Sequence, residues 1–349
     1  MWRDIVNILV TGNRGYIGCI LTKLLLNRGY SVKGFDTDYY KGCELKKLDT
    51  SIQQINKDIR KVSKADLKGI DAIIHLAALS NDPLGELNQK LTYDINYVAT
   101  IRLATLAKEI GIKRFVYSSS QSMYGVAKTD EELDEDTSEK NPITMYAKTK
   151  WDAECELKKL GDDDFTVVCF RPSTVFGVSP RLRCDIVYNN FIASAYTTGK
   201  IEVKSDGSPW RPVVHIRDVS NAFIAGIEAP EKLISNESFN VGIKDGNFTV
   251  TQLAEAAQNV VKGSSIIYTG EHGSDARTYR VSFVKILSVL KEYYKPEWDL
   301  LRGGNELIHF FDETHFTEAM FKGKQCNRTL QLKNLMNEKK INEKMYWMT

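Results

Sequence analysis

The feature that most constrains the fold is an apolar run followed at once by closely spaced glycines. The run covers residues 5–10 and leads into Thr11-Gly12-Asn13-Arg14-Gly15-Tyr16-Ile17-Gly18. Residues 16–28 then place apolar side chains at helical spacing, and Gly29 follows. A buried strand, a glycine-rich turn and a helix in this order predict the first unit of a parallel α/β sheet.

The spacing of the three glycines predicts a site for the diphosphate of a dinucleotide. Gly12 permits a tight turn, Gly15 lets the backbone approach the phosphates, and Gly18 lets the helix pack closely on the sheet. The start of the helix offers free N–H groups and a partial positive charge. A structural turn with incidental glycines is the alternative explanation.

An acidic residue at the end of the second predicted strand indicates which dinucleotide binds. Asp36 ends the strand at 31–36 and lies 18 residues after Gly18. A carboxylate there accepts hydrogen bonds from ribose hydroxyls and repels a 2′-phosphate, which favours NAD over NADP. Arg14 lies in the loop and can tolerate a 2′-phosphate, so NADP stays open. Asp58 and Ile59 follow a third strand and are placed to meet the adenine.

Strands and helices continue to alternate as far as residue 172. Further strands are expected at about 55–58, 71–76, 114–117 and 165–170, with helices at about 89–110 and 143–160. This pattern predicts an α/β protein with a Rossmann-type doubly wound parallel sheet. We expect residues 1–172 to form an NAD-binding domain. Residues 173–349, with helices at 185–198 and 249–261, should form mainly a smaller C-terminal α+β substrate-binding lobe, interleaved with the last strands of the sheet.

Composition excludes several classes of function. The chain has 349 residues, a net charge of +2 and an ordinary hydrophobic content of 42%, which argues against nucleic acid or membrane partners. The six cysteines show no CxxC pairing and the five histidines no ligand spacing, so we expect reduced thiols, no metal and a cytoplasmic location. An acidic stretch at 130–139 and a basic one at 322–349 are expected to be solvated or to contact a second subunit.

Three residues could move a proton while a hydride moves. Tyr146 and Lys150 are four apart on a predicted helix and therefore share one face. A tyrosine, with an ordinary pKa near 10, needs a nearby cation to act as acid or base near neutrality. Lys150 supplies that cation, and Ser120 would share the substrate oxygen with Tyr146. A surface contact between Tyr146 and Lys150 is the structural alternative.

With these motifs in place, the chain resembles the extended short-chain dehydrogenase/reductase family, in its NAD-dependent nucleotide-sugar epimerase/dehydratase branch. Besides the motifs above, the resemblance rests on His75-Leu76-Ala77-Ala78, the run 117–125, Arg171-Pro172 and the run 211–219. It implies that Ser120, Tyr146 and Lys150 are catalytic and that a nucleoside-diphosphate sugar lies in the C-terminal lobe. It also implies a homodimer, in which the helices at 89–110 and 143–160 of two subunits form a four-helix bundle.

Motif and resemblance together give the expected site residues. The cofactor-binding residues are Gly12, Arg14, Gly15, Tyr16, Ile17, Gly18, Asp36, Asp58, Ile59, Leu76, Ala77, Ala78, Asn96, Ser118, Tyr146, Lys150, Pro172 and Ser173. The substrate-binding residues are Ser80, Asn81, Ser120, Gln121, Ser122, Asn189 (or Asn190), Arg211 and Arg277. The two arginines are expected at the diphosphate, because a guanidinium binds phosphate oxygens bidentately.

The family's 4,6-dehydratases carry an Asp and a Glu directly after the position of Ser120, and this chain has Gln121 and Ser122. Neither side chain can serve as that acid or base, so the expected reaction is epimerisation of a nucleotide sugar through a transient keto sugar. The alternatives are reduction of a keto sugar with NAD(P), or the family's dehydration or decarboxylation. A protein of another class, a non-catalytic NAD-binding regulator, also stays open.

Overall fold

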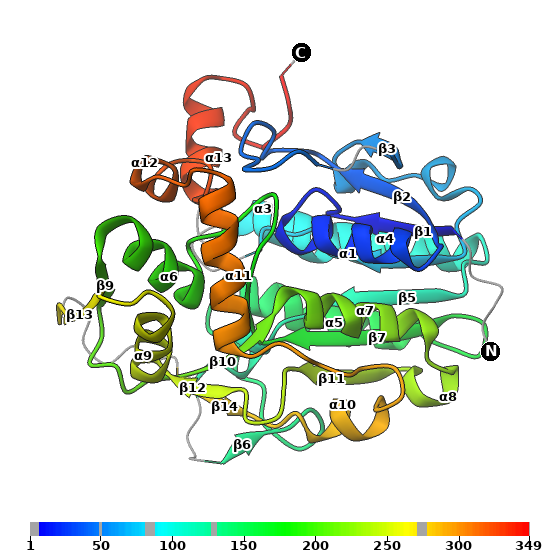
Figure 1. Ribbon diagram of the computed structural model, residues 1–349. Coiled ribbons are helices and arrows are strands. Elements are labelled where there is room, and N and C mark those ends of the chain that lie inside the picture. The colour runs from blue at the N-terminus through cyan, green and yellow to red at the C-terminus, as the bar shows by residue number, and fades with distance from the viewer. Residues whose placement is uncertain (1–6, 49–50, 81–87, 127–130, 271–277, 349) are drawn as a thin grey trace.

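The computed structural model describes residues 7–48, 51–80, 88–126, 131–270 and 278–348. Its centre is a seven-stranded parallel sheet (Figure 1) with the order β11-β7-β5-β4-β1-β2-β3. The strands are β1 (Asn7–Thr11), β2 (Ser31–Asp36), β3 (Gln53–Asn56), β4 (Ala72–His75), β5 (Arg114–Ser118), β7 (Thr166–Pro172) and β11 (Glu237–Val241). The predicted Rossmann-type α/β fold is confirmed. The third strand lies slightly earlier than the predicted 55–58 and pairs with β2 from Lys33 to Asp36.

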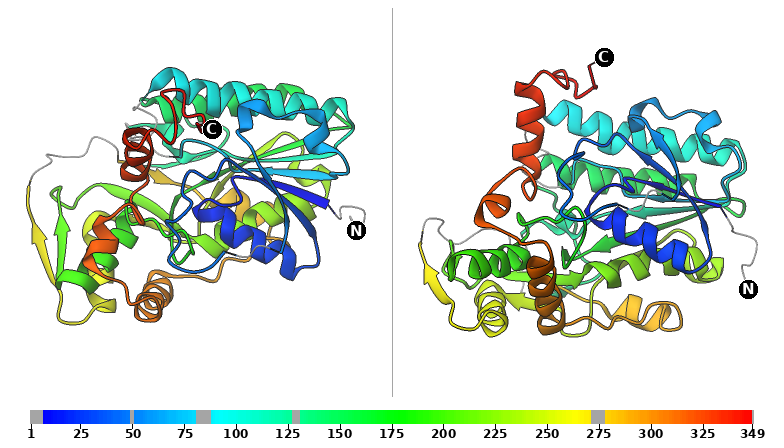
Figure 2. Two further views of the ribbon diagram at one scale, coloured as in Figure 1. Left: turned by 90° about the horizontal axis from the view of Figure 1, so that it is seen from above. Right: turned by 45° about the horizontal axis from the view of Figure 1, so that its top comes forward.

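Helices cover both faces of this sheet, as Figure 2 shows from two directions. One face carries α1 (Tyr16–Asn27) and α7 (Ile216–Glu228), and the other carries α4 (Ala99–Glu109) and α5 (Met145–Leu160). Strand β1 shows how its sequence serves both layers. Val10 packs in one buried cluster with Leu21 and Phe223, whereas Leu9 packs in the other with Leu103 and Leu157. Successive side chains of a strand point to opposite faces, so an unbroken apolar run is required here.

The predicted helix at 89–110 is continuous but not uniform. Helix α3 (Gln89–Tyr93) passes into a π-helical turn, η3 (Asp94–Val98), before α4 begins. The turn contains Asn96. Its side-chain oxygen accepts from the Leu79 N–H at 2.8 Å, and its side-chain nitrogen donates to the Leu79 backbone oxygen at 3.1 Å. Such turns often mark places where a side chain is needed in a fixed position.

Most of the remaining chain forms small sheets and helices beside the carboxyl edge of the main sheet, whereas two short helices, Glu231–Ile234 and Val284–Val289, lie along its edge strand β11 (Figure 1). The strands are β8 (Thr174–Phe176), β10 (Trp210–His215) and β12 (Asn247–Thr249) in one sheet, β9 (Lys200–Val203) and β13 (Ser265–Tyr268) in a second, and β6 (Glu132–Leu133) and β14 (Arg280–Val281) in a third. The helices are α6 (Val187–Thr198), α8 (Glu231–Ile234), α9 (Val250–Val260), α10 (Val284–Val289), α11 (Leu300–Glu313), α12 (Glu318–Lys322) and α13 (Arg328–Asn337). Short 3-10 turns are η1 (Ile59–Lys61), η2 (Lys64–Leu67) and η4 (Gln121–Tyr124).

The C-terminal residues return to the first half of the chain. Helix α13 and the segment after it lie beside the loop that follows β2 (Figure 1). Gln331 donates from its side chain to the backbone oxygen of Tyr39 at 3.0 Å, and the Trp347 indole donates to the backbone oxygen of Thr37 at 2.7 Å. The basic C-terminal stretch is therefore partly buried against the first half of the chain, which the sequence did not predict.

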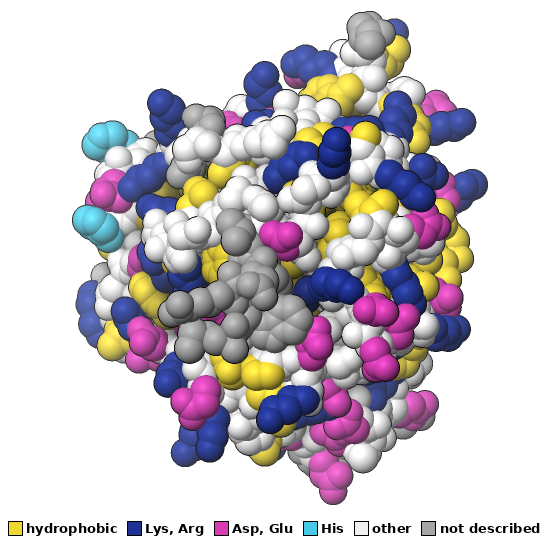
Figure 3. Space-filling model, turned by 90° about the vertical axis from the view of Figure 1, so that its right-hand side faces the viewer, with side chains coloured by type: hydrophobic (Ala, Val, Ile, Leu, Met, Phe, Trp, Pro, Cys, Tyr) yellow, Lys and Arg dark blue, Asp and Glu magenta, His cyan; other side chains and the backbone are white. Residues whose placement is uncertain are grey.

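The surface has mixed charge on the face shown in Figure 3, where Lys and Arg side chains are interspersed with Asp and Glu. Within the described ranges, every helix is too short or too polar to cross a bilayer.

Candidate active site at the carboxyl edge of the sheet

A cleft of about 1420 Å³ lies where the parallel strands end. Asp36, Leu76, Ser118 and Pro172 line it from the ends of four different strands or from the residues directly after them. Ligands of doubly wound sheets bind outside the carboxyl ends of the strands, so this cleft is where the fold alone places a binding site. Residues from the first half of the chain form one part of it, and residues from the C-terminal half form the rest.

The glycine-rich loop forms the floor of the cleft. Gly12 has φ +72°, and a Cβ on it would lie 2.8 Å from the backbone nitrogen of Ala77. A Cβ on Gly18 would lie 2.1 Å from the backbone oxygen of Gly12, so both positions require glycine. Helix α1 begins directly after Gly15 and turns its first residues, Tyr16 and Ile17, toward the cleft. This arrangement fits a dinucleotide diphosphate at the helix N-terminus.

Asp36 lines the cleft beside this loop and is held by backbone groups. Its carboxylate accepts hydrogen bonds from the N–H of Asp38 at 2.7 Å and of Arg14 at 3.1 Å. Burial raises the pKa of Asp36 above its usual value. The Arg14 side chain instead pairs with Asp38 at 2.5 Å and contacts Asn56 at 3.0 Å, and it is not among the residues that line the cleft.

The remaining predicted cofactor residues fall into two groups. Those that line the same cleft are Gly15, Ile17, Asp58, Ile59, Leu76, Ala77, Ala78, Ser118, Pro172 and Ser173. Asn96 does not line it, because its amide is used to fix Leu79 and approaches the Thr149 hydroxyl at 3.4 Å. Asn96 therefore shapes the wall behind the cleft rather than facing a ligand.

Ser120, Tyr146 and Lys150 all line the same cleft as the glycine loop. Ser120 directly precedes the turn η4 and caps it: its hydroxyl accepts from the Ser122 N–H at 3.1 Å and donates to the Ser122 hydroxyl at 3.0 Å. Tyr146 lies in the first turn of α5, which is capped by the Thr144 side chain. The structure therefore brings these three side chains together in one cavity.

Lys150 is buried, and its burial changes the pKa of its ammonium group. Its ammonium donates to the backbone oxygen of Ser118 at 2.7 Å and lies 4.9 Å from the centre of the Tyr117 ring. Burial lowers the pKa of Lys150 to about 7, because the charged form loses its hydration. A lysine with such a pKa responds strongly to any negative charge that develops beside it.

A buried ion pair supports the backbone before Ser120, and the sequence analysis missed it. Arg171 and Glu154 are both almost fully buried and bond at 2.5 Å. The Glu154 carboxylate also accepts from Ser119 at 2.5 Å and Ser238 at 2.6 Å. Burial alone would raise the pKa of Glu154, but the guanidinium of Arg171 holds it below its usual value. Charged residues on a strand and a helix gave no signal that their side chains meet inside.

Only some of the predicted substrate residues line the cleft. Ser80, Ser120, Gln121, Ser122 and Arg211 line the cleft. Asn189 does not, because its amide is used inside the protein: it accepts from the Gly177 N–H at 2.9 Å and donates to Tyr16 and Arg183. Its neighbour Asn190 does line the cleft. Asn81 and Arg277 lie outside the described residues.

Gln121, at the position where the dehydratases carry their Asp, is 1% exposed and donates from its side chain to the backbone oxygen of Arg171 at 3.0 Å. Many other lining residues were not predicted, because short sequence motifs mark only a few of the positions that face a cavity formed by segments distant in the chain. They are Phe35, Thr37, Tyr39, Tyr40, Lys57, Leu79, Ile95, Ser119, Thr174, Val175, Arg183, Asp185, Ile186, Val187, Phe191, Glu202, Lys204, Ser205, Val250, Tyr279, Asn327, Arg328 and Thr329.

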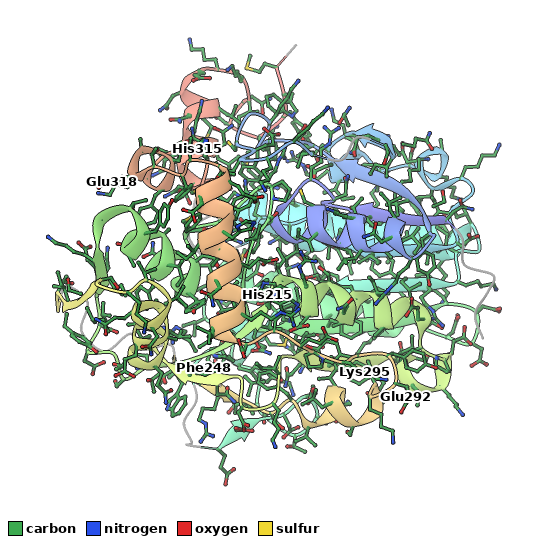
Figure 4. All side chains as sticks on the ribbon, in the orientation of Figure 1. His215, Phe248, Glu292, Lys295, His315 and Glu318 are labelled. Carbon is green, nitrogen blue, oxygen red and sulfur yellow. The ribbon has the colours of Figure 1, made fainter. Side chains whose placement is uncertain are left out.

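No cluster of three or more His, Cys, Asp or Glu within the described ranges is arranged to hold a metal ion. Figure 4 shows His215 beside α11, far from His315 at the other end of that helix. His215 stacks on Trp298 with ring centres 4.1 Å apart and bonds Glu306 at 3.1 Å, which is a structural arrangement.

Comparisons with known proteins agree with this geometry. The model of the NAD dependent epimerase/dehydratase family matches residues 8–242. The chain belongs to this family. It is 28% identical over 321 residues to a UDP-glucuronate 4-epimerase of Thermodesulfobacterium geofontis, which covers 87% of this chain and 96% of that relative. It is also 28% identical over 275 residues to the dTDP-D-glucose 4,6-dehydratase of Mus musculus, over 73% of each chain.

Among solved structures, the fold resembles that of MoeE5 in complex with UDP-glucuronic acid and NAD, with a TM-score of 0.75 and 25% identity. The match covers 99% of MoeE5 but 88% of this chain. The expected family and the expected NAD cofactor are confirmed. Family members in these comparisons differ in reaction, so the residues of the cleft must decide among them.

Proposed function

We propose that the protein is an NAD-dependent nucleotide-sugar epimerase that inverts C4 of a uridine diphosphate sugar of the UDP-glucuronate and UDP-glucose class. One observation carries the proposal. Ser120, Tyr146 and Lys150 face the glycine-loop cleft, while the neighbouring Gln121 and Ser122 are neutral. The cleft thus contains groups for oxidising and re-reducing a sugar hydroxyl. It lacks, among its described lining residues, the carboxyl pair of the dehydratases directly after Ser120.

The roles of the residues follow from their chemistry. NAD, when bound, supplies a hydride acceptor that later returns the same hydride. Tyr146 takes the proton of the sugar hydroxyl as the C–O bond becomes a carbonyl, and gives a proton back when the carbonyl is reduced on its other face. Lys150 stabilises the phenolate form of Tyr146 by its charge. Ser120 holds the sugar oxygen in both half-reactions.

The cofactor and the sugar are held by different parts of the chain in this proposal. Residues 1–172 hold NAD through the glycine loop and Asp36, and residues 173–349 mainly hold the nucleotide sugar. Arg211 and Lys204 line the cleft on the C-terminal side and offer positive charge to the sugar's diphosphate. Ser80 and Ser122 line the same cleft and can donate to sugar hydroxyls.

We also propose a homodimer in the cytoplasm. Helices α3 to α5 carry exposed apolar side chains, with Tyr93 39% and Val98 46% exposed, and Ile143 just before α5 is 50% exposed. The rings of Tyr93 and Tyr97 lie 4.9 Å apart on this face, which would be covered if two copies packed these helices into a four-helix bundle. Light scattering showing a monomer at micromolar concentration would contradict the dimer. The unbridged state of all six cysteines agrees with a reducing compartment.

The test of the reaction is incubation of the purified protein, charged with NAD, with UDP-glucuronate and UDP-glucose in separate samples. We expect proton NMR to show the C4 epimer of at least one sugar, with no net accumulation of NADH. Net consumption of added NADH with a keto-sugar substrate, and no epimer from either sugar, would favour the reductase instead. Lys150→Gln should remove most of this activity, and Lys148→Gln, which removes a positive charge from the exposed, opposite side of the same helix, is its matched control and should keep it.

A further inference from the structure

The C-terminal segment 327–347 is built into the wall of the cofactor cleft. Asn327, Arg328 and Thr329 line the cleft directly. The segment is held by Gln331 and Trp347 on the loop after β2, as described above, and by Arg60, which donates to the backbone oxygen of Lys344 at 2.9 Å. Just before it, the N–H of Cys184 donates to the backbone oxygen of Cys326 at 3.2 Å. This segment lies beyond residues 8–242, the part matched by the family model.

One side chain of this segment has a charge without a partner. Arg328 is 3% exposed, and its guanidinium stacks on the Tyr40 ring, 4.0 Å from the ring centre. Its Nη2 donates to the backbone oxygen of Arg181 at 2.8 Å. Its Nη1 is buried with no hydrogen-bond partner among the described residues. A buried donor left unbonded is unfavourable, and more so when it is charged, so one on a side chain that lines the cleft is a candidate to bind a ligand there.

The neighbouring arginines show that this charge is unusual. Arg181 pairs with Asp38 at 2.6 Å and Glu44 at 2.5 Å, and Arg183 pairs with Asp185 at 2.7 Å. Arg328 has no carboxylate within ion-pair distance in the described part of the chain. Burial lowers the pKa of Arg328, as do the charges of Arg183 and Arg181, while Tyr40 and Asp185 act in the opposite direction. Arg181 thus uses two carboxylates and Arg183 uses one, so Arg328 is left without an ion pair of its own, which an anion in the cleft would supply.

Contacts place this charge close to the glycine loop. Arg181, which accepts from Arg328, donates from its Nη1 to the backbone oxygen of Arg14 at 2.9 Å, and Arg14 is in the loop itself. Arg183 also lines the cleft and reaches the hydroxyl of Ser80 at 3.5 Å, beyond the end of β4. A group lying on the N-terminus of α1 would therefore meet these guanidinium groups on its other side.

We propose that Arg328 binds the diphosphate of NAD, so that the C-terminal segment is a working part of the cofactor site. The α1 N-terminus holds the phosphates from one side and Arg328 holds them from the other. The proposal rests on NAD as the cofactor and does not depend on which reaction follows. It also predicts that NAD leaves slowly, because the wall around it is fastened by the hydrogen bonds of Gln331 and Trp347. Slow release suits an epimerase, which needs no exchange of cofactor between turnovers.

The test is calorimetric titration of the cofactor-free full-length protein with NAD, ADP and adenosine. A hydrogen bond to a charged group contributes about 1.5–3 kcal/mol, which corresponds to roughly 10- to 150-fold in affinity. We expect Arg328→Gln to weaken NAD and ADP by that factor and to leave adenosine within about threefold. Arg328→Lys should recover part of the loss. The dissociation rate of NADH, followed by its fluorescence after mixing with excess NAD, should rise in Arg328→Gln.

Lys333→Gln is the matched control, because it removes one positive charge from an exposed position of the same helix. It should leave all three affinities unchanged. Equal affinities of wild type and Arg328→Gln for NAD and ADP would overturn the proposal. So would a loss for adenosine as large as the loss for ADP, since that would indicate a misplaced wall. In a fourth titration, with NADP, a loss of affinity for NADP alone would assign Arg328 to a 2′-phosphate instead and would also overturn the proposal.

Discussion

Replacing Glu154 by glutamine removes the negative charge from an ion pair that is sealed inside the protein. The carboxylate bonds Arg171 at 2.5 Å, and both side chains are no more than 2% exposed. It also accepts from the hydroxyls of Ser119 and Ser238. Glutamine has nearly the same shape, so the change leaves the packing intact and leaves the charge of Arg171 without compensation.

The expected loss of stability is large for an isosteric change. Removing one partner of a buried pair costs about 3–5 kcal/mol, because the remaining charge stays buried. The matched control is Glu156→Gln on the same helix. Glu156 pairs with Lys159 at 2.8 Å on the surface, and the Lys159 side chain is 70% exposed. An exposed pair contributes about 0–1 kcal/mol, so the control should be almost neutral.

Urea unfolding of the cofactor-free protein, followed by circular dichroism, measures both variants against wild type. Arg171→Gln and the double variant complete a double-mutant cycle. The double variant should lose much less than the sum of the two single losses, because neither charge is then left alone. Activity should fall as well, since Ser119 directly precedes Ser120. A loss below about 1 kcal/mol for Glu154→Gln, equal to that of Glu156→Gln, would refute this account of the pair.

Three further predictions concern the cofactor and the proton path. Wild type should bind NADH at least about tenfold more tightly than NADPH, because Asp36 repels a 2′-phosphate. Fluorescence titration measures both affinities, and equal values would show that Asp36 does not have this role. Tyr146→Phe should lower kcat by about 10²- to 10⁴-fold with NAD affinity unchanged, and a rate above about a tenth of wild type would mean that another residue moves the proton. Burial lowers the pKa of Lys150 to about 7, so the unfolded chain binds more protons than the folded one above that pH. The free energy of unfolding of cofactor-free protein should therefore rise from about pH 7 toward pH 10, by up to about 1.4 kcal/mol per pH unit from this group, and Lys150→Met should flatten that rise.

The first half of the fold was predictable because its signals are local. The buried strand β1, the glycine turn and helix α1 each follow from a few adjacent residues, and the alternation continues to β7. The apolar runs and the glycine spacing are therefore enough to predict the sheet and the edge of it where the cofactor binds. The C-terminal half was not predictable in detail, because its short strands pair over long distances. β8, for example, pairs with β10 from Thr174 to Phe176 across more than thirty residues.

Within the site, the sequence predicted residue types better than their orientation. Asn189 and Asn190 are adjacent, and only the direction of helix α6 decides that Asn190 lines the cleft while Asn189 bonds Gly177 and Tyr16. Arg328 lies in a stretch whose charge resembled a solvated tail. Its contact with Tyr40 depends on where α13 docks, which no local pattern records.

The central claim is that one hydride leaves and returns to the same sugar carbon inside one protein molecule. UDP-glucuronate and UDP-glucose carrying deuterium at C4 test this most directly, with mass spectrometry and NMR of the product and unlabelled NADH present in the solution. The account predicts an epimer of unchanged mass that keeps its deuterium, because the cofactor is not exchanged during turnover. A product lighter by one water or by carbon dioxide, or an epimer that has lost its deuterium to the solution, would contradict it.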